Sequence, residues 1–166
     1  MTLQQIASEV DIDYSASTGR PFYSEFEQRF VIDDYKFNVH KPLIRGWDFS
    51  YHHPACCFMQ QDEKDNLYEI FEIQGNDLDL FDFILVVKYC SKMPLDDEQE
   101  DRVRYLCQNG KIENVTNIAH LQRFDSSSFQ DYCDAAGNQK SDKSKQTSIE
   151  ILRSSGVYPR FKTARS

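Results

Sequence analysis

The stretch that decides the fold is Leu43-Ile44-Arg45-Gly46-Trp47-Asp48-Phe49, which leads into the polar, bulky loop Ser50 to Pro54. Its apolar composition predicts a β-strand that ends where the loop begins. An acid between Trp47 and Phe49 is costly to bury unless it is paired or binds a metal ion. Open α/β sheets collect ligands at such strand ends. Asp48 is therefore a candidate metal ligand; the alternative is that it only caps the loop.

Two further strands and a helix are expected after this loop. The second strand is Ala55 to Gln60, and its hairpin partner is Asn66 to Gln74, across the charged turn Asp62 to Asp65. The spacing then becomes helical, with Asn76 or Asp77 as N-cap and Pro94 after the end. The apolar positions of this helix are Leu78, Phe81, Leu85, Val86 and Tyr89, and we expect Phe81, Ile84 and Leu85 to lie in the core.

The second half of the chain is less regular. Residues 95–128 are poorly patterned and predict a helical excursion or a mobile insertion. Phe129 to Asp134 predicts a strand that enters the small-residue turn Ala135-Ala136-Gly137. A short helix is expected from Thr147 or Ser148 to Arg153, stopped by Gly156, followed by a strand from Val157 to Thr163. This order predicts an α/β fold in which a sheet is flanked by helices.

Asp134 repeats the situation of Asp48, because it also stands at the end of a predicted strand. Two carboxylates from neighbouring strand ends form an oxygen-only ligand set, which suits Mg²⁺ or Mn²⁺ rather than zinc. Phosphodiesterases of the two-metal kind need such a set. The alternative for Asp134 alone is an acid of an Asx-turn.

Composition places the chain among soluble globular proteins of one domain's size. It has 166 residues, 40% of them hydrophobic, and a formal charge of −8. Residues 139–166 carry seven basic residues against two acids, or +5, so residues 1–138 carry −13. This basic end could face phosphates. We expect no signal peptide and no membrane span, and five scattered cysteines indicate reduced thiols in the cytoplasm.

Three segments resemble the nuclease domain of the large terminase subunit of tailed bacteriophages. Residues 42–55, with Gly46-Trp47-Asp48-Phe49 and Pro54-Ala55, are similar to that family's first acidic motif. Asp134-Ala135-Ala136-Gly137, with Thr147-Ser148-Ile149 after it, resembles the second. Phe22 to Phe26 is similar to the segment between the packaging ATPase and the nuclease. The resemblance covers nearly the whole chain.

The resemblance implies an RNase H-like fold with a five-stranded mixed sheet, formed by residues 21–166 after a linker at residues 1–20. It also implies cleavage of concatemeric double-stranded DNA by two-metal hydrolysis with Mg²⁺ or Mn²⁺. Asp48 and Asp134 would be catalytic metal ligands. The implied partners are the packaging ATPase domain, the small terminase subunit and the portal, in the host cytoplasm. The expected DNA contacts are Lys140, Lys143 and Lys145.

The chain departs from the family in its third acidic motif, an aspartate-bearing C-terminal helix. Nothing like it follows Thr163, so we expect a domain truncated before that helix. Asp142 is a conceivable substitute or a solvated loop acid, and Glu72 is an extra metal ligand or a surface acid of the hairpin. His52 and His53 are expected to be loop residues near the site. Two alternatives remain open: a catalytically incomplete fragment that only binds DNA or packaging partners, and an RNase H-like enzyme of another branch, such as a resolvase or integrase.

Overall fold

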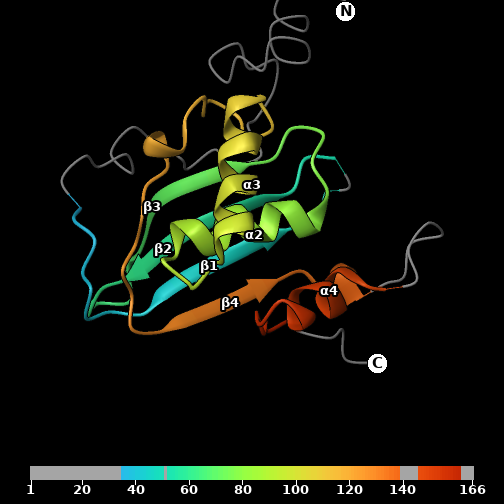
Figure 1. Cartoon of the computed structure of the whole chain (residues 1–166). Coiled ribbons are helices and arrows are strands. Elements are labelled where there is room, and N and C mark those ends of the chain that lie inside the picture. Colours follow the sequence, from blue (N-terminus) through green and yellow to red (C-terminus); the bar gives the residue numbers. More distant parts are fainter. Residues whose placement is uncertain (1–34, 51, 139–145, 162–166) are drawn as a thin grey trace, which may run out of the picture. The chain divides into compact units, whose positions relative to one another are not determined.

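The computed structural model describes residues 35–50, 52–138 and 146–161, apart from the side chains of residues 136 and 138 (Figure 1). These residues form an α/β fold in which a sheet is flanked by helices, as the sequence predicts. The strands and α-helices are β1 (Leu43–Asp48), β2 (Ala55–Gln61), β3 (Leu67–Gln74), α2 (Leu80–Cys90), α3 (Asp97–Gln108), β4 (Phe129–Cys133) and α4 (Ser148–Ser154).

The sheet is mixed, with the strand order β3-β2-β1-β4. β1 to β3 form an antiparallel meander, whereas β4 pairs with β1 in parallel. The arrows of β1 and β4 accordingly point the same way in Figure 1. The two middle strands, β2 and β1, are paired on both sides. The carboxyl ends of β1 and β4 therefore meet at one end of the sheet.

The two faces of β1 differ in burial. Leu43, Arg45 and Trp47 are buried, whereas Ile44 and Gly46 are only half-buried and Asp48 is exposed. The buried face is covered by α2, whose Phe83 ring meets the indole of Trp47 edge-on at a centroid distance of 6.3 Å. We call this the core face of the sheet, and the opposite one the open face.

A buried ion pair joins β1 to β4. Arg45 and Asp131 are register partners, and the Arg45 guanidinium donates two hydrogen bonds to the Asp131 carboxylate, of 2.7 and 2.8 Å. Arg45 also donates to the hydroxyl of Ser91, at the end of α2, and the indole of Trp47 donates to Asp131. Both charges are nearly inaccessible, Arg45 at 1% and Asp131 at 7% exposure. Each is stabilised because the other is present.

The first helix begins later than the sequence predicts. The N-cap of α2 is Asp79, whose carboxylate accepts a hydrogen bond from the backbone of Asp82, and not Asn76 or Asp77. Asp77 has a left-handed backbone, with φ of 47°, where an N-cap is extended. The buried positions are Phe83, Ile84, Val86, Val87 and Cys90. The prediction that Phe81 lies in the core is wrong, because this side chain is 53% exposed.

The poorly patterned residues 95–128 are in large part helical. They form α3, whose N-terminus is closed by a capping box between Asp96 and Gln99, and a 3-10 turn at Ile118–His120. The expected helix near residue 147 is confirmed as α4, with Thr147 as N-cap and a reciprocal bond to Glu150. The expected strand from Val157 to Thr163 is not assigned in the described residues, which end at 161. They make one parallel bridge, between Tyr132 and Arg160.

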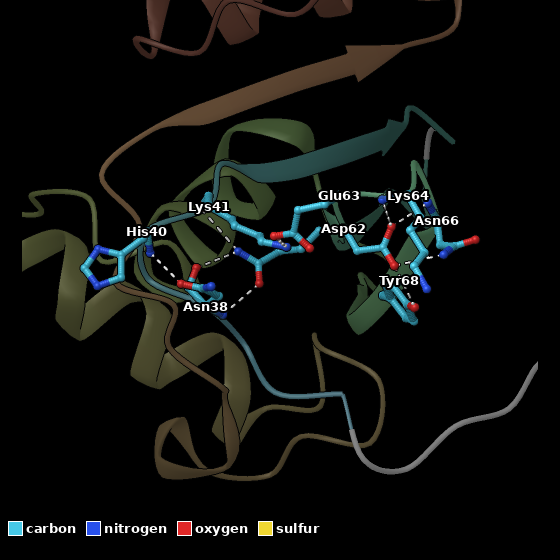
Figure 2. A network of polar contacts seen from close by, with 9 residues as sticks. Asn38, His40, Lys41, Asp62, Glu63, Lys64, Asn66 and Tyr68 are labelled. Carbon is cyan, nitrogen blue, oxygen red and sulfur yellow. Dashed lines mark hydrogen bonds and ion pairs between the residues drawn. The ribbon is translucent and has the colours of Figure 1, made fainter.

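Polar contacts hold the start of β1 against the β2–β3 hairpin (Figure 2). Lys41 forms an ion pair of 2.8 Å with Glu63 in the hairpin turn. The Asp62 carboxylate accepts hydrogen bonds from the backbone of Lys64 and Asn66 and from the side chains of Asn66 and Tyr68. These bonds, that of the Asn66 side chain first, lower the pKa of Asp62 to about 2. The Asp62 carboxylate is therefore charged at neutral pH, in the form that accepts these hydrogen bonds within the hairpin.

We expect Asp131→Ala to lower the free energy of unfolding by about 3–5 kcal/mol, because it leaves the buried charge of Arg45 without its partner. The matched control is Asp125→Ala, which breaks the exposed Lys92–Asp125 pair of 3.2 Å and should cost at most about 1 kcal/mol. Urea unfolding of both variants measures the difference. Equal, small losses would show that the buried pair does not stabilise the sheet.

Candidate metal centre at the ends of two parallel strands

The strand register brings Asp48 and Asp134 together. The last paired residues of β1 and β4 are Trp47 and Cys133. The residue that follows each of them in the sequence is a candidate acid, Asp48 or Asp134. Neighbouring strands lie about 4.8 Å apart, and register partners of parallel strands point to the same face. Asp48 and Asp134 therefore stand side by side at the carboxyl ends of adjacent strands.

The segments that follow the two acids are packed against each other. Gly137, three residues after Asp134, is buried against the ring of Phe49, the residue after Asp48. A Cβ atom at position 137 would come within 2.4 Å of Cε2 of that ring. Only a residue without a side chain fits here, and the contact links both strand ends independently of the backbone pairing.

Both candidate acids are exposed, and the alternation of β1 directs Asp48 to the open face of the sheet. The neighbouring acid of β4, Asp131, points to the core face and is bound to Arg45 and Trp47, so it is not free to bind an ion. Asp48 and Asp134 offer carboxylate oxygens alone, at positions that solvent reaches. Such a donor set fits Mg²⁺ or Mn²⁺, which keep part of their shell as water.

A second group of possible ligands lies on the same face, on β2 and β3. The Cys57 sulfur and one carboxylate oxygen each of Glu69 and Glu72 lie within 4.8 Å of one another. Burial raises the pKa of Cys57 to about 12, and the charges of Glu69, Glu72 and Asp48 act in the same direction. The thiol is therefore protonated at neutral pH. The influence of Asp48 shows that the two groups are electrostatic neighbours.

A β-bulge explains how both glutamates reach the open face. Residues three apart point to opposite faces of a regular strand. Here the register shifts after the Phe58–Phe71 pair, so that Met59 faces Glu69, and Ile70 is the extra residue. The broken alternation of Glu69 and Glu72 in the sequence is the signal of this bulge. Nothing in the sequence pattern singles out Cys57, which is the register partner of Glu72.

The remaining candidates are placed elsewhere or not described. Lys140, Lys143, Lys145 and Asp142 lie outside the described residues, so their predicted roles stay predictions. His52 and His53 are loop residues, as expected. The Nδ1 atom of His52 lies 3.0 Å from the carboxylate of Asp77, and that of His53 lies 3.3 Å from the carbonyl oxygen of Gly75. These contacts hold the loop between β1 and β2 against the start of α2.

We expect Gly137→Ala to displace the Phe49 ring, to lower the free energy of unfolding by about 1–3 kcal/mol, and to weaken Mn²⁺ binding. Urea unfolding and titration calorimetry with Mn²⁺ measure the two effects. The double variant Phe49→Leu/Gly137→Ala, in which a smaller side chain makes room for the methyl group, should recover part of both. A single variant as stable as the parent would contradict the close packing.

We expect Glu72→Gln to make the Cys57 thiol more reactive. Removing a negative charge lowers the pKa of Cys57, and each unit by which it falls raises the thiolate fraction at pH 8 about tenfold. The rate of alkylation by iodoacetamide, followed at the Cys57 peptide by mass spectrometry, checks this. The control is Glu98→Gln, an exposed acid of α3. Equal rates in the two variants would contradict the neighbourhood of Cys57 and Glu72.

This chain was compared with protein-family models and with curated proteins. No protein-family model matches it, and no curated protein matches it significantly. Among the described residues, the helices are too short or too polar to span a bilayer. The functional argument therefore depends on the strand-end acids, their surroundings and the motifs that contain them.

Proposed function

We propose that this chain is a metal-dependent endonuclease domain of the large-terminase type, which cuts concatemeric double-stranded DNA. The observation that carries the proposal is the juxtaposition of Asp48 and Asp134 at the ends of two adjacent parallel strands. Both acids belong to the segments that resemble the acidic motifs of terminase nucleases. Two distant parts of the chain, each with its own resemblance, thus meet at one place.

The architecture is compatible with an RNase H-like fold. The four strands form a mixed sheet, and the bridge between Tyr132 and Arg160 lies on the free edge of β4. A strand that began at Arg160 would run parallel to β4 and would be the fifth of the sheet. This supports the proposed fold without requiring any rearrangement of the described elements.

Asp48 and Asp134 would hold the divalent ions, Mg²⁺ or Mn²⁺. Such ions, when bound, activate a water molecule and stabilise the leaving oxygen of the phosphodiester. The protein itself supplies the positions of the two carboxylates, because the buried Arg45–Asp131 pair fixes the register of the strands. Glu72, on the same face, is the proposed further acid of the site.

We expect divalent cations to strengthen DNA binding at this end of the sheet, because the exposed acids oppose it. Asp48, Asp134, Glu69 and Glu72 are all exposed, and together they repel the phosphates of DNA. Neutralisation by bound metal removes that repulsion. The packaging ATPase, the small terminase subunit and the portal remain the proposed partners, and the host cytoplasm the proposed location.

We expect the protein to convert supercoiled plasmid to nicked and linear forms in Mn²⁺ or Mg²⁺, and a chelator to stop the reaction. Asp48→Ala and Asp134→Ala should each lower the rate at least about hundredfold, because even residues that only orient metal ligands contribute 10- to 100-fold. Asp101→Asn, at an exposed acid of α3 in a surface pair of 3.7 Å with Arg104, is the control. Thermal unfolding confirms that the variants are folded.

Retained metal-dependent cleavage in Asp48→Ala would contradict the assignment of this residue. A wild-type protein that binds plasmid but cuts it in neither metal would contradict nuclease activity and favour the catalytically incomplete fragment. Preferential cutting of branched over linear duplex DNA would instead favour an enzyme of the resolvase type.

A further inference from the structure

The surface beyond β4 differs in character from the rest of the open face. On the β3 side, the open face carries the exposed acids Glu69 and Glu72. On the β4 side it carries Tyr132, which is 40% exposed, and the segment bridged to β4 adds the exposed Arg160 and Tyr158, the latter at 71% exposure. Two large aromatic side chains on a protein surface, beside a cation, call for an explanation other than packing.

The backbone pairing places Arg160 next to the candidate metal centre. Arg160 is bridged to Tyr132, with its amide donating to the carbonyl oxygen of Asp131 at 2.7 Å and its carbonyl accepting from the amide of Cys133 at 3.1 Å. Bridge partners point to the same face, so Arg160 stands beside Tyr132 on the open face. Tyr132 itself is two residues before Asp134. Tyr158 is 71% exposed and lies two residues before Arg160, beyond the buried Pro159.

A second arginine lies close to the same strand end. The helix α4 packs against the 3-10 turn Ala135–Asn138, which directly follows Asp134. Arg153, on α4, is exposed. Asp134 therefore has an arginine in its surroundings as well as on the adjacent bridge.

These two arginines are available to bind a ligand. Arg45, Arg102 and Arg104 each form an ion pair with a carboxylate. Within residues 35–50, 52–138 and 146–161, Arg153 and Arg160 form none. In a chain of formal charge −8, exposed arginines without an acid partner beside exposed tyrosines make a surface suited to a polyanion with flat or apolar faces.

We propose that Tyr132, Tyr158, Arg160 and Arg153 form the track along which one strand of the DNA substrate reaches Asp134. The arginines bind successive phosphates, and the tyrosine rings contact the sugars or bases between them. The acids on the β3 side repel phosphates, so the strand approaches from the β4 edge. This inference rests on the proposed function, and it adds the direction of approach and the residues that position the backbone.

The test is binding of a fluorescein-labelled 30-base-pair duplex, measured by anisotropy in EDTA, where no metal-dependent cutting occurs. We expect Arg160→Ala and Arg153→Ala each to weaken binding about tenfold and to lower the slope of log Kd against log salt by about 1. Tyr158→Ala should weaken binding about five- to tenfold, and Tyr158→Phe should not. Arg104→Ala is the matched control, an exposed arginine on α3 that pairs with Glu100.

Cleavage assays separate this inference from the proposed function. In Mn²⁺, Arg160→Ala should raise the KM for duplex DNA and leave kcat close to that of the parent. Duplex binding that depends on Arg160 and Tyr158 without any cleavage would uphold the track and contradict the nuclease. Metal-dependent cleavage by a protein whose Arg160, Arg153 and Tyr158 variants bind like the parent would overturn the track and leave the nuclease standing. Absence of duplex binding by the parent would also overturn the track.

Discussion

The structure depends on the buried pair of Arg45 and Asp131. A guanidinium and a carboxylate removed from water are tolerable only with partners on all sides, and here Ser91 and Trp47 supply the remaining hydrogen bonds. The pair also defines the register of β1 and β4. A slip by one residue would turn both charges to the wrong face and separate them, so the correct alignment is the only one in which both are satisfied. The positions of Asp48 and Asp134 follow from that alignment.

The two faces of the sheet differ in role: one forms the hydrophobic core, and the other carries the candidate ligands. The core face carries aromatic rings such as those of Trp47 and Phe58, and it packs against α2, whose Phe83 ring meets that of Trp47. The open face carries the exposed acids. The bulge in β3 adds Glu69 to this face without disturbing the burial of Phe71 beside it. One irregularity in the backbone thus lets an edge strand contribute to the core and to the acidic face at once.

Acidic and basic side chains are unevenly distributed over the protein, which the net charge of −8 does not reveal. The acids of α3 cluster in its first turn, where they interact favourably with the helix dipole and lie away from the candidate centre. On the open face, Glu69 and Glu72 each have a carboxylate oxygen within 4.8 Å of the Cys57 sulfur. In contrast, Arg153 and Arg160, which are exposed and form no ion pair within the described residues, lie beyond β4. A negatively charged protein can therefore present a locally basic approach to an acidic site.

By itself the sequence determined the local features: the bounds of four strands to within one residue, the capped start of α4 at Thr147, and the presence of an acid at two strand ends. Each of these depends on alternation, composition or a capping residue within a few positions. Only the tertiary structure decided which strand lies beside β1, that Arg45 is buried, that Phe81 is exposed, and that Cys57 lies beside two glutamates. These depend on contacts between residues far apart in the chain, such as Arg45 with Asp131 and Phe49 with Gly137. A local pattern cannot specify its distant partner, because the choice depends on which arrangement satisfies every buried group together.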